Sequence, residues 1–135
     1  MFILDTMVVS ERTKSRPDAR VRAWLNTIDP NTQFISAISI GEIRFGVERL
    51  SHSPAKQRLQ IWLDDLKSMF AGRVLTVDLA VCERWGHLRA RLGRSLSVSD
   101  ALIGATALVH GLAVATRNEQ DFADFGLRVV NPWAP

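Results

Sequence analysis

The sequence predicts an α/β protein with three layers, α/β/α, built on a central, mostly parallel sheet. Short apolar runs of strand length alternate with amphipathic segments of helical spacing along the whole chain. This order favours crossover connections between parallel strands, which place helices on both faces of the sheet. The length of 135 residues is that of one ordinary domain, so we expect a single domain over residues 1–135, without linker or repeat.

The first half of the chain contains two expected strands and three expected helices. Phe2–Leu4 is apolar and too short for a buried helix, so it is predicted to be a strand buried on both faces. Gln33–Ala37 is the second expected strand. Apolar residues at helical spacing predict the helices Asp18–Ile28, Ser39–Leu50 and Pro54–Phe70.

The second half continues the alternation. Val74–Val77 is a third candidate strand, and a helix is expected from Ala80 to about Leu92. Ser97 is expected to open the helix Val98–His110. The apolar runs Leu112–Ala115 and Leu127–Val130 complete the predicted sheet.

The composition is that of a folded globular protein with a small excess of positive charge. Hydrophobic residues make up 47% of the chain, and 17 Lys and Arg against 14 Asp and Glu give a formal net charge of +3. This excess is compatible with a polyanionic partner such as nucleic acid, but it does not identify one.

Cysteine usage and the lengths of the apolar stretches indicate a cytoplasmic protein. Cys82 is the single cysteine and cannot form an internal disulfide, and we expect it to pack in the core beside Val81 rather than to act as a nucleophile. The apolar stretch Ala101–Ala115 contains Thr106 and His110 and is too short to cross a bilayer. We therefore expect no membrane span.

Four polar side chains stand at junctions between predicted strands and helices. Asp5 follows the first strand, Glu42 and Asp100 are expected in the first turns of their helices, and Asn118 follows the strand Leu112–Ala115. Ligands of parallel α/β sheets collect at the carboxyl ends of the strands. We expect these four side chains to reach that one edge.

Each of these residues also has an alternative interpretation as a helix-start residue. The segments SIGE (Ser39–Glu42) and SVSD (Ser97–Asp100) match the capping box, and NEQD (Asn118–Asp121) resembles one. A carboxylate in a first turn gains about 0.3–1 kcal/mol from the helix dipole. For Glu42 alone the cap is favoured, whereas Asp5 directly follows apolar residues and has no such box, although it could itself be an N-cap.

Considered together, these residues favour a metal site over four independent caps. Carboxylates that converge on one sheet edge repel each other, and no equal set of arginines accompanies them in the sequence. Mg²⁺ and Mn²⁺ prefer oxygen ligands and accept one or two carboxylates together with water and substrate phosphate. Such a site supports phosphodiester hydrolysis. No P-loop, dinucleotide-binding, serine-hydrolase or H-E-x-x-H motif indicates a different chemistry.

These segments resemble the motifs of PIN-domain ribonucleases. FILDTMVVSE is similar to the family's opening LDTNVISE, SAISIGEIRFGVERL to its second acidic motif, and SVSDALIGATALVHGLAVATRN to its third and fourth. VVNPW is similar to the C-terminal end of one subgroup, and the resemblance is closest to the VapC and FitB toxins of toxin–antitoxin pairs. It covers nearly the whole chain in order and spacing and implies a PIN-like fold.

The resemblance implies a Mg²⁺ or Mn²⁺ site formed by Asp5, Glu42 and Asp100, with Asn118 at the place of the fourth family acid. Asparagine brings no charge, which should loosen a second metal ion, and Asp121 is a possible compensating acid. Met7 is a second departure, because relatives commonly have Asn or Ser there and methionine removes a hydrogen bond. Our hypothesis is that the site remains active.

RNA contacts and partners are less directly indicated. Arg12, Arg44 and Arg117 flank the acidic motifs and could hold an RNA backbone, and Thr6 offers a hydroxyl in the first motif, although solvated surface residues are an equal alternative for each. The resemblance implies a homodimer neutralised by a cognate antitoxin, with transfer RNA as the first substrate to consider. The alternative functions are a catalytically weakened PIN module that binds RNA or antitoxin, and a PIN nuclease of ribosomal RNA processing or DNA metabolism.

Overall fold

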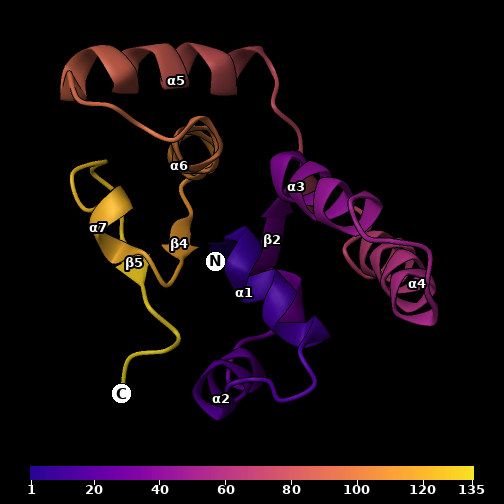
Figure 1. The fold of residues 1–135 in the computed structure, drawn as a ribbon. Coiled ribbons are helices and arrows are strands. Elements are labelled where there is room, and N and C mark those ends of the chain that lie inside the picture. The colour runs from indigo at the N-terminus through magenta and orange to yellow at the C-terminus, as the bar shows by residue number, and fades with distance from the viewer.

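The computed structural model describes residues 1–135, which form a three-layer α/β/α fold (Figure 1). Its central sheet has five strands in the order β3-β2-β1-β4-β5, and every neighbouring pair is parallel. The expected sheet of mostly parallel strands is therefore confirmed as entirely parallel. The strands are β1 (Phe2–Leu4), β2 (Gln33–Ser36), β3 (Val74–Leu75), β4 (Ala113–Ala115) and β5 (Val129–Val130).

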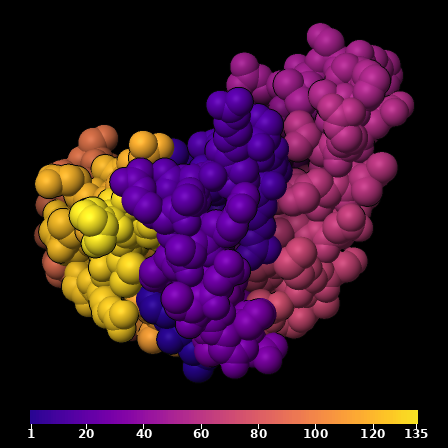
Figure 2. Space-filling view, turned by 90° about the horizontal axis from the view of Figure 1, so that it is seen from below, coloured from indigo at the N-terminus to yellow at the C-terminus, as the bar shows by residue number.

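Helices connect all the strands. α1–α4 belong to the first part of the chain and α5–α7 to the second, with short 3-10 turns at Glu11–Thr13 and Pro30–Thr32. The helices are α1 (Thr6–Ser10), α2 (Ala19–Asn26), α3 (Ala37–Glu48), α4 (Pro54–Met69), α5 (Leu79–Leu92), α6 (Val98–His110) and α7 (Glu119–Phe122). The far end of the α3–α4 hairpin, magenta in Figure 2, projects from the body of the molecule.

The two faces of the sheet have separate cores because successive strand residues point to opposite sides. In β1, Leu4 packs with residues of α1–α4, whereas Ile3 packs with residues of α5–α7. Both side chains are fully buried. The short apolar run at the start of the chain therefore supports both halves of the fold.

The register of β1 determines what lies at the carboxyl edge of the sheet. Leu4 pairs with Ile35 of β2 on one side and with Ala115 of β4 on the other. The next residues along these strands are Asp5, Ser36 and Thr116, and all three are buried. Polar side chains from three strand ends are thus brought together at the middle of one edge.

The sequence-based expectations were wrong in several local details. The short helices α1 and α7 were not expected, and α3 begins at Ala37 instead of Ser39. Strand β3 is only two residues long, Val74–Leu75. Cys82 is exposed and not in the core. The buried residues of α5 are Val81 and Leu88, and Cys82, the residue after Val81, lies on a different side of the helix.

No helix of the protein combines the length and the apolar character that crossing a bilayer requires.

Candidate active site

Asp5 lies where β1 ends and α1 begins, and its side chain is 5% exposed. It is the N-cap of α1: its Oδ1 accepts a hydrogen bond from the backbone N–H of Val8 at 3.1 Å. Its Oδ2 accepts a hydrogen bond from the hydroxyl of Thr116, at the end of β4. The carboxylate is therefore held in one orientation by two different elements.

The surroundings of Asp5 act on its pKa in opposite directions. Burial raises the pKa above its ordinary value, and the hydrogen bonds from Thr116 and from backbone N–H groups of α1 lower it, with burial the larger effect. The nearby charge of Glu42 raises it further. A positive charge beside Asp5 would relieve both the desolvation and this repulsion.

Glu42 lies in the second turn of α3 and does not form the capping box expected for SIGE. The N-cap of α3 is Ser36, whose hydroxyl accepts from the backbone N–H of Ile38 at 3.1 Å, whereas Ser39 is buried inside the helix. The Oε1 atom of Glu42 instead accepts from the Thr6 hydroxyl at 2.7 Å. Glu42 therefore takes no part in capping α3. The interpretation of Glu42 as a helix-start residue, which we favoured when it was considered by itself, is wrong.

Thr6 connects α1 to α3. Besides its bond to Glu42, its hydroxyl oxygen is 2.9 Å from the hydroxyl oxygen of Ser39. Thr6 was predicted as a possible RNA contact, and in the structure it orients an acidic side chain of the site. Ser39 was not predicted as part of this network.

Asp100 lies in the first turn of α6, as predicted, and Ser97 caps this helix by accepting from the backbone N–H of Asp100 at 3.3 Å. The pKa of Asp100 is raised to about 6 by burial and then by the charges of Asp121, Asp5 and Glu42. Asp5, Glu42 and Asp121 therefore lie close enough to Asp100 for their charges to act on it. The structure therefore brings Asp5, Glu42, Asp100 and Asp121 to one region of the sheet edge.

Asn118 lies beside this region, at the start of α7. Its backbone N–H donates to the Thr116 hydroxyl oxygen at 3.0 Å, and its side-chain Nδ2 lies 3.7 Å from the sulfur of Met7. The two positions at which the chain departs from the family pattern are therefore in contact. Asp121, three residues after Asn118, is one of the carboxylates whose charges raise the pKa of Asp100.

The arginines that we expected near the site differ in their surroundings. Arg44 forms ion pairs with Glu48 and Asp64, both at 3.4 Å. Arg12 stacks over Phe70 with its guanidinium carbon 5.8 Å from the ring centroid. Arg117 is exposed and stacks over the buried Trp133 at 5.4 Å. Arg117 thus keeps a charge that no carboxylate neutralises.

The acidic residues themselves have no cationic partner. None of the ion pairs in the structure includes Asp5, Glu42, Asp100 or Asp121. No three His, Cys, Asp or Glu side chains converge closely enough to form a complete metal shell. An open set of repelling oxygen ligands nevertheless suits Mg²⁺ or Mn²⁺, which keep several waters and take only one or two carboxylates.

Thr116 is a site residue that the sequence did not reveal. It is fully buried, donates to Asp5 and accepts from the backbone of Asn118. One signal was available: Thr116 follows the apolar strand β4 directly, just as Asp5 follows β1. A polar residue after each of two adjacent parallel strands predicts a contact between them.

A parallel sheet with acidic side chains gathered at its carboxyl edge defines the protein as an α/β domain with an open acidic site. A family model for the PIN domain matches residues 2–126. The chain belongs to the PIN-domain family, which confirms the resemblance found in its motifs.

Individual relatives agree with this assignment. The chain is 39% identical over 142 residues to the VapC ribonuclease Y4jK of Sinorhizobium fredii, and the match covers 100% of this chain and 99% of the relative. The crystal structure of FitAcB from Neisseria gonorrhoeae contains a chain similar at a TM-score of 0.93 and 35% identity, with 100% of both chains covered. VapBC2 of Rickettsia felis, bound to a DNA fragment from its promoter, is similar at a TM-score of 0.78 and 25% identity, covering 96% of this chain and 97% of its own.

Proposed function

We propose that this protein is a metal-dependent endoribonuclease that acts as the toxin of a toxin–antitoxin pair and hydrolyses RNA phosphodiester bonds. The observation that carries the proposal is the group of carboxylates at the sheet edge, whose charges add to burial in raising the pKa of Asp5 and Asp100 and which form no ion pair. The names of the relatives, a VapC ribonuclease, the toxin FitB and a toxin–antitoxin complex from Klebsiella pneumoniae, suggest the substrate class and the biological role.

In this proposal Asp5, Glu42 and Asp100 hold Mg²⁺ or Mn²⁺. When bound, the ion makes a hydroxide nucleophile available near neutral pH and neutralises charge on the phosphate. Thr116 and the N-terminus of α1 fix the orientation of Asp5, and Thr6 fixes that of Glu42. Asn118 offers an amide oxygen at the edge of the site, and Asp121 supplies the charge that Asn118 lacks.

Cations beside the site position the RNA in this proposal. Arg117 follows Thr116 directly, and its guanidinium stacks on Trp133 without a carboxylate partner, which leaves its charge free to bind a phosphate. Arg44 is a weaker candidate because its guanidinium pairs with Glu48 and Asp64. Arg12 is weaker because it is partly buried and its guanidinium donates to the sulfur of Met69 at 3.2 Å. Single-stranded loops of transfer RNA are the first substrates to test, since their bases and backbone are accessible.

The decisive experiment is cleavage of total cellular RNA by the purified protein with Mn²⁺ or Mg²⁺, with Asp5→Asn as the matched variant. Asparagine keeps the size of Asp5 but removes the charge. Cleavage that disappears in the variant and on chelation would establish the ribonuclease, and mapping of the cut ends would give its target. Equal inactivity of both proteins in the presence of metal would contradict the proposal.

We also propose a cognate antitoxin and a homodimer as the partners. A groove of about 360 Å³ beside α4 is lined by Arg12, Leu59 and Trp62 among others, and it offers an apolar surface to a partner helix. The unpaired carboxylates of the site would accept a basic side chain of the same partner. Light scattering of the purified chain tests the dimer, and a monomer would contradict it.

A second candidate function is a PIN module that binds RNA or antitoxin without cleaving. The contact between Met7 and Asn118 favours it, because a thioether and an amide there replace groups that would orient water or carry charge. Retention of RNA by a wild-type protein that does not cleave it would support this alternative.

A further inference from the structure

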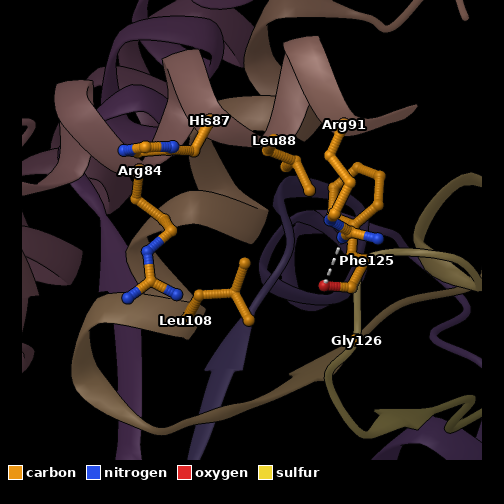
Figure 3. Close-up of a pocket in the computed structure, with 7 residues that line it drawn as sticks. All are labelled: Arg84, His87, Leu88, Arg91, Leu108, Phe125 and Gly126. Atoms are coloured by element: carbon orange, nitrogen blue, oxygen red, sulfur yellow. Dashed lines mark hydrogen bonds between the residues drawn. The ribbon is translucent and has the colours of Figure 1, made fainter. Parts of the chain in front are cut away.

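A second hollow lies on the α5–α6 side of the molecule, apart from the carboxylates. It has a volume of about 550 Å³ and is enclosed by α5, α6 and the turn between α7 and β5. Figure 3 shows Arg84 and Arg91 projecting from α5 toward the opposite wall, with Leu88 between them. The opposite wall consists of Leu108, Phe125 and Gly126. We refer to this hollow as the α5 groove.

The α5 groove is lined by basic side chains and by no acidic one. Arg84, His87 and Arg91 are its charged or titratable residues, and all three are exposed. None of them forms an ion pair. Arg91 donates to the backbone carbonyls of Asp124 and Phe125, both at 3.2 Å, and these bonds fix its position. The nearby Asp124 carboxylate is paired with Arg94 and forms no ion pair with Arg91.

The unpaired positive charges continue beyond the α5 groove. A neighbouring hollow of about 420 Å³ shares Leu108 and Gly126 with it and continues to Met1 and Arg128. Arg128 stacks over Phe2 at 5.4 Å and has no carboxylate partner. Cations repeated along a connected depression match a ligand whose negative charges are repeated at intervals, as the phosphates of a nucleic acid are.

The α5 groove adjoins the acidic site through α6 and α7. Leu108 is eight residues after Asp100 on α6, which is about 12 Å along the helix. On the other wall, the charge of Asp121 acts on Asp100, and Phe125, which lines the groove, follows Asp121 after only three intervening residues. If a nucleic-acid strand were bound in the α5 groove, the nucleotides that follow the bound segment would therefore be able to reach the carboxylates.

We infer that the α5 groove binds the sugar-phosphate backbone of single-stranded RNA, with Arg84, His87 and Arg91 on phosphates next to the bond that is cut. This inference rests on the proposed ribonuclease function and adds the path of the substrate. An acidic peptide is the other ligand that a basic groove could take. RNA fits better because the groove lies beside α6, whose first turn carries Asp100, and the chemistry proposed for that site requires a phosphate.

The test measures binding of a fluorescein-labelled single-stranded 12-nucleotide RNA in EDTA by fluorescence anisotropy at several salt concentrations. The variant is the double substitution Arg84→Gln and His87→Gln, since neither side chain has a structural partner. Arg89→Gln is the control, because Arg89 lies on the same helix but lines none of the hollows described above and stacks on Trp85. Circular dichroism confirms that all variants are folded.

We expect the double variant to raise the Kd for the 12-mer about fivefold or more at low salt and to reduce the salt slope by about one for each phosphate that is no longer neutralised. Arg89→Gln should leave the Kd and the salt slope close to their wild-type values. A 4-nucleotide RNA is too short to fill both the α5 groove and the acidic site, so its Kd should differ little between wild type and the double variant.

Three outcomes would overturn the inference. If wild type cleaves RNA with metal while the double variant binds the 12-mer with unchanged Kd and slope, the groove assignment fails and the ribonuclease stands. An equal loss of affinity for the 12-mer in Arg89→Gln would show that binding depends on the net charge of the protein and not on the groove. Tighter binding of a poly-glutamate peptide than of RNA, abolished in the double variant, would make the groove a peptide site. A wild type that neither binds nor cleaves RNA would contradict the proposed function itself.

Discussion

Thr116 donates a hydrogen bond from its hydroxyl to Oδ2 of Asp5, and this bond joins the carboxyl ends of the two central strands β4 and β1. The same hydroxyl oxygen accepts the backbone N–H of Asn118. One buried threonine therefore fixes the orientation of the first acid and the start of the segment that carries Asn118 and Asp121. Groups of this kind around metal ligands commonly change affinity or activity by about 10- to 100-fold when they are removed.

Thr116→Val should lower metal-dependent RNA cleavage by about tenfold while keeping the shape of the side chain. Because the hydroxyl bond lowers the pKa of Asp5, its loss should raise that pKa and shift the acid limb of the pH–rate profile to higher pH. Thr116→Ser keeps the donor and should stay close to wild type. If valine and serine variants had the same activity and pH profile, the hydrogen bond would have no role in the reaction.

Asp100 should make the metal-free protein less stable as the pH rises. Its folded-state pKa of about 6 lies above the value of about 3.9 expected in the unfolded chain, so the native state binds more protons between these values. The unfolding free energy therefore falls as the pH rises through this window, and the raised pKa of Asp5 acts in the same direction. Thermal unfolding in EDTA at about pH 5 and about pH 7 measures the effect.

The matched variant for this pH dependence is Asp100→Asn, which should flatten the fall in Tm. Mn²⁺ should raise the Tm of wild type more at pH 7 than at pH 5, because a cation binds the ionised carboxylates. A wild-type Tm that rises between pH 5 and pH 7 in EDTA would show that the carboxylates do not repel each other as their positions indicate.

Met7→Asn should increase metal-dependent cleavage by about tenfold if the thioether has removed a hydrogen bond that orients water or a carboxylate. Met7 is 41% exposed and its sulfur contacts Asn118, so asparagine can enter this position without disturbing the core. Met7→Leu keeps the apolar character and should leave the rate unchanged. Equal rates in all three proteins would show that Met7 does not tune the site.

The large-scale fold could be predicted because each core strand and helix carries its own pattern. Phe2–Leu4 is apolar throughout, and Ser97 followed by Asp100 marks the start of α6 correctly. Because the strands are parallel, Asp5 and Asn118 had to follow neighbouring strand ends at one edge. The acidic region therefore follows from local signals combined with one topological rule.

The details that failed depend on tertiary contacts. Helix α1 has only five residues, too few to show a helical period, and its β-branched Val8 and Val9 favour a strand when considered alone. The sequence indicated Ser39 as the cap of α3, but β2 ends at Ser36, and this residue is the cap in the structure. The α5 groove could not be predicted, because it requires α5 to face the turn at Phe125.

Two helical glycines should respond to alanine in opposite directions. A Cβ atom at Gly104 of α6 would lie 2.3 Å from Cδ2 of Phe125, a ring that is buried and packed edge-on against Phe122. Gly104→Ala should therefore reduce the free energy of unfolding by about 1–3 kcal/mol. Gly86 of α5 has nothing within 4 Å of its added Cβ, so Gly86→Ala should increase stability by about 0.5–1 kcal/mol through helix propensity. Urea unfolding of both variants measures the difference, and a Gly104→Ala protein as stable as wild type would show that the Phe125 ring moves away freely.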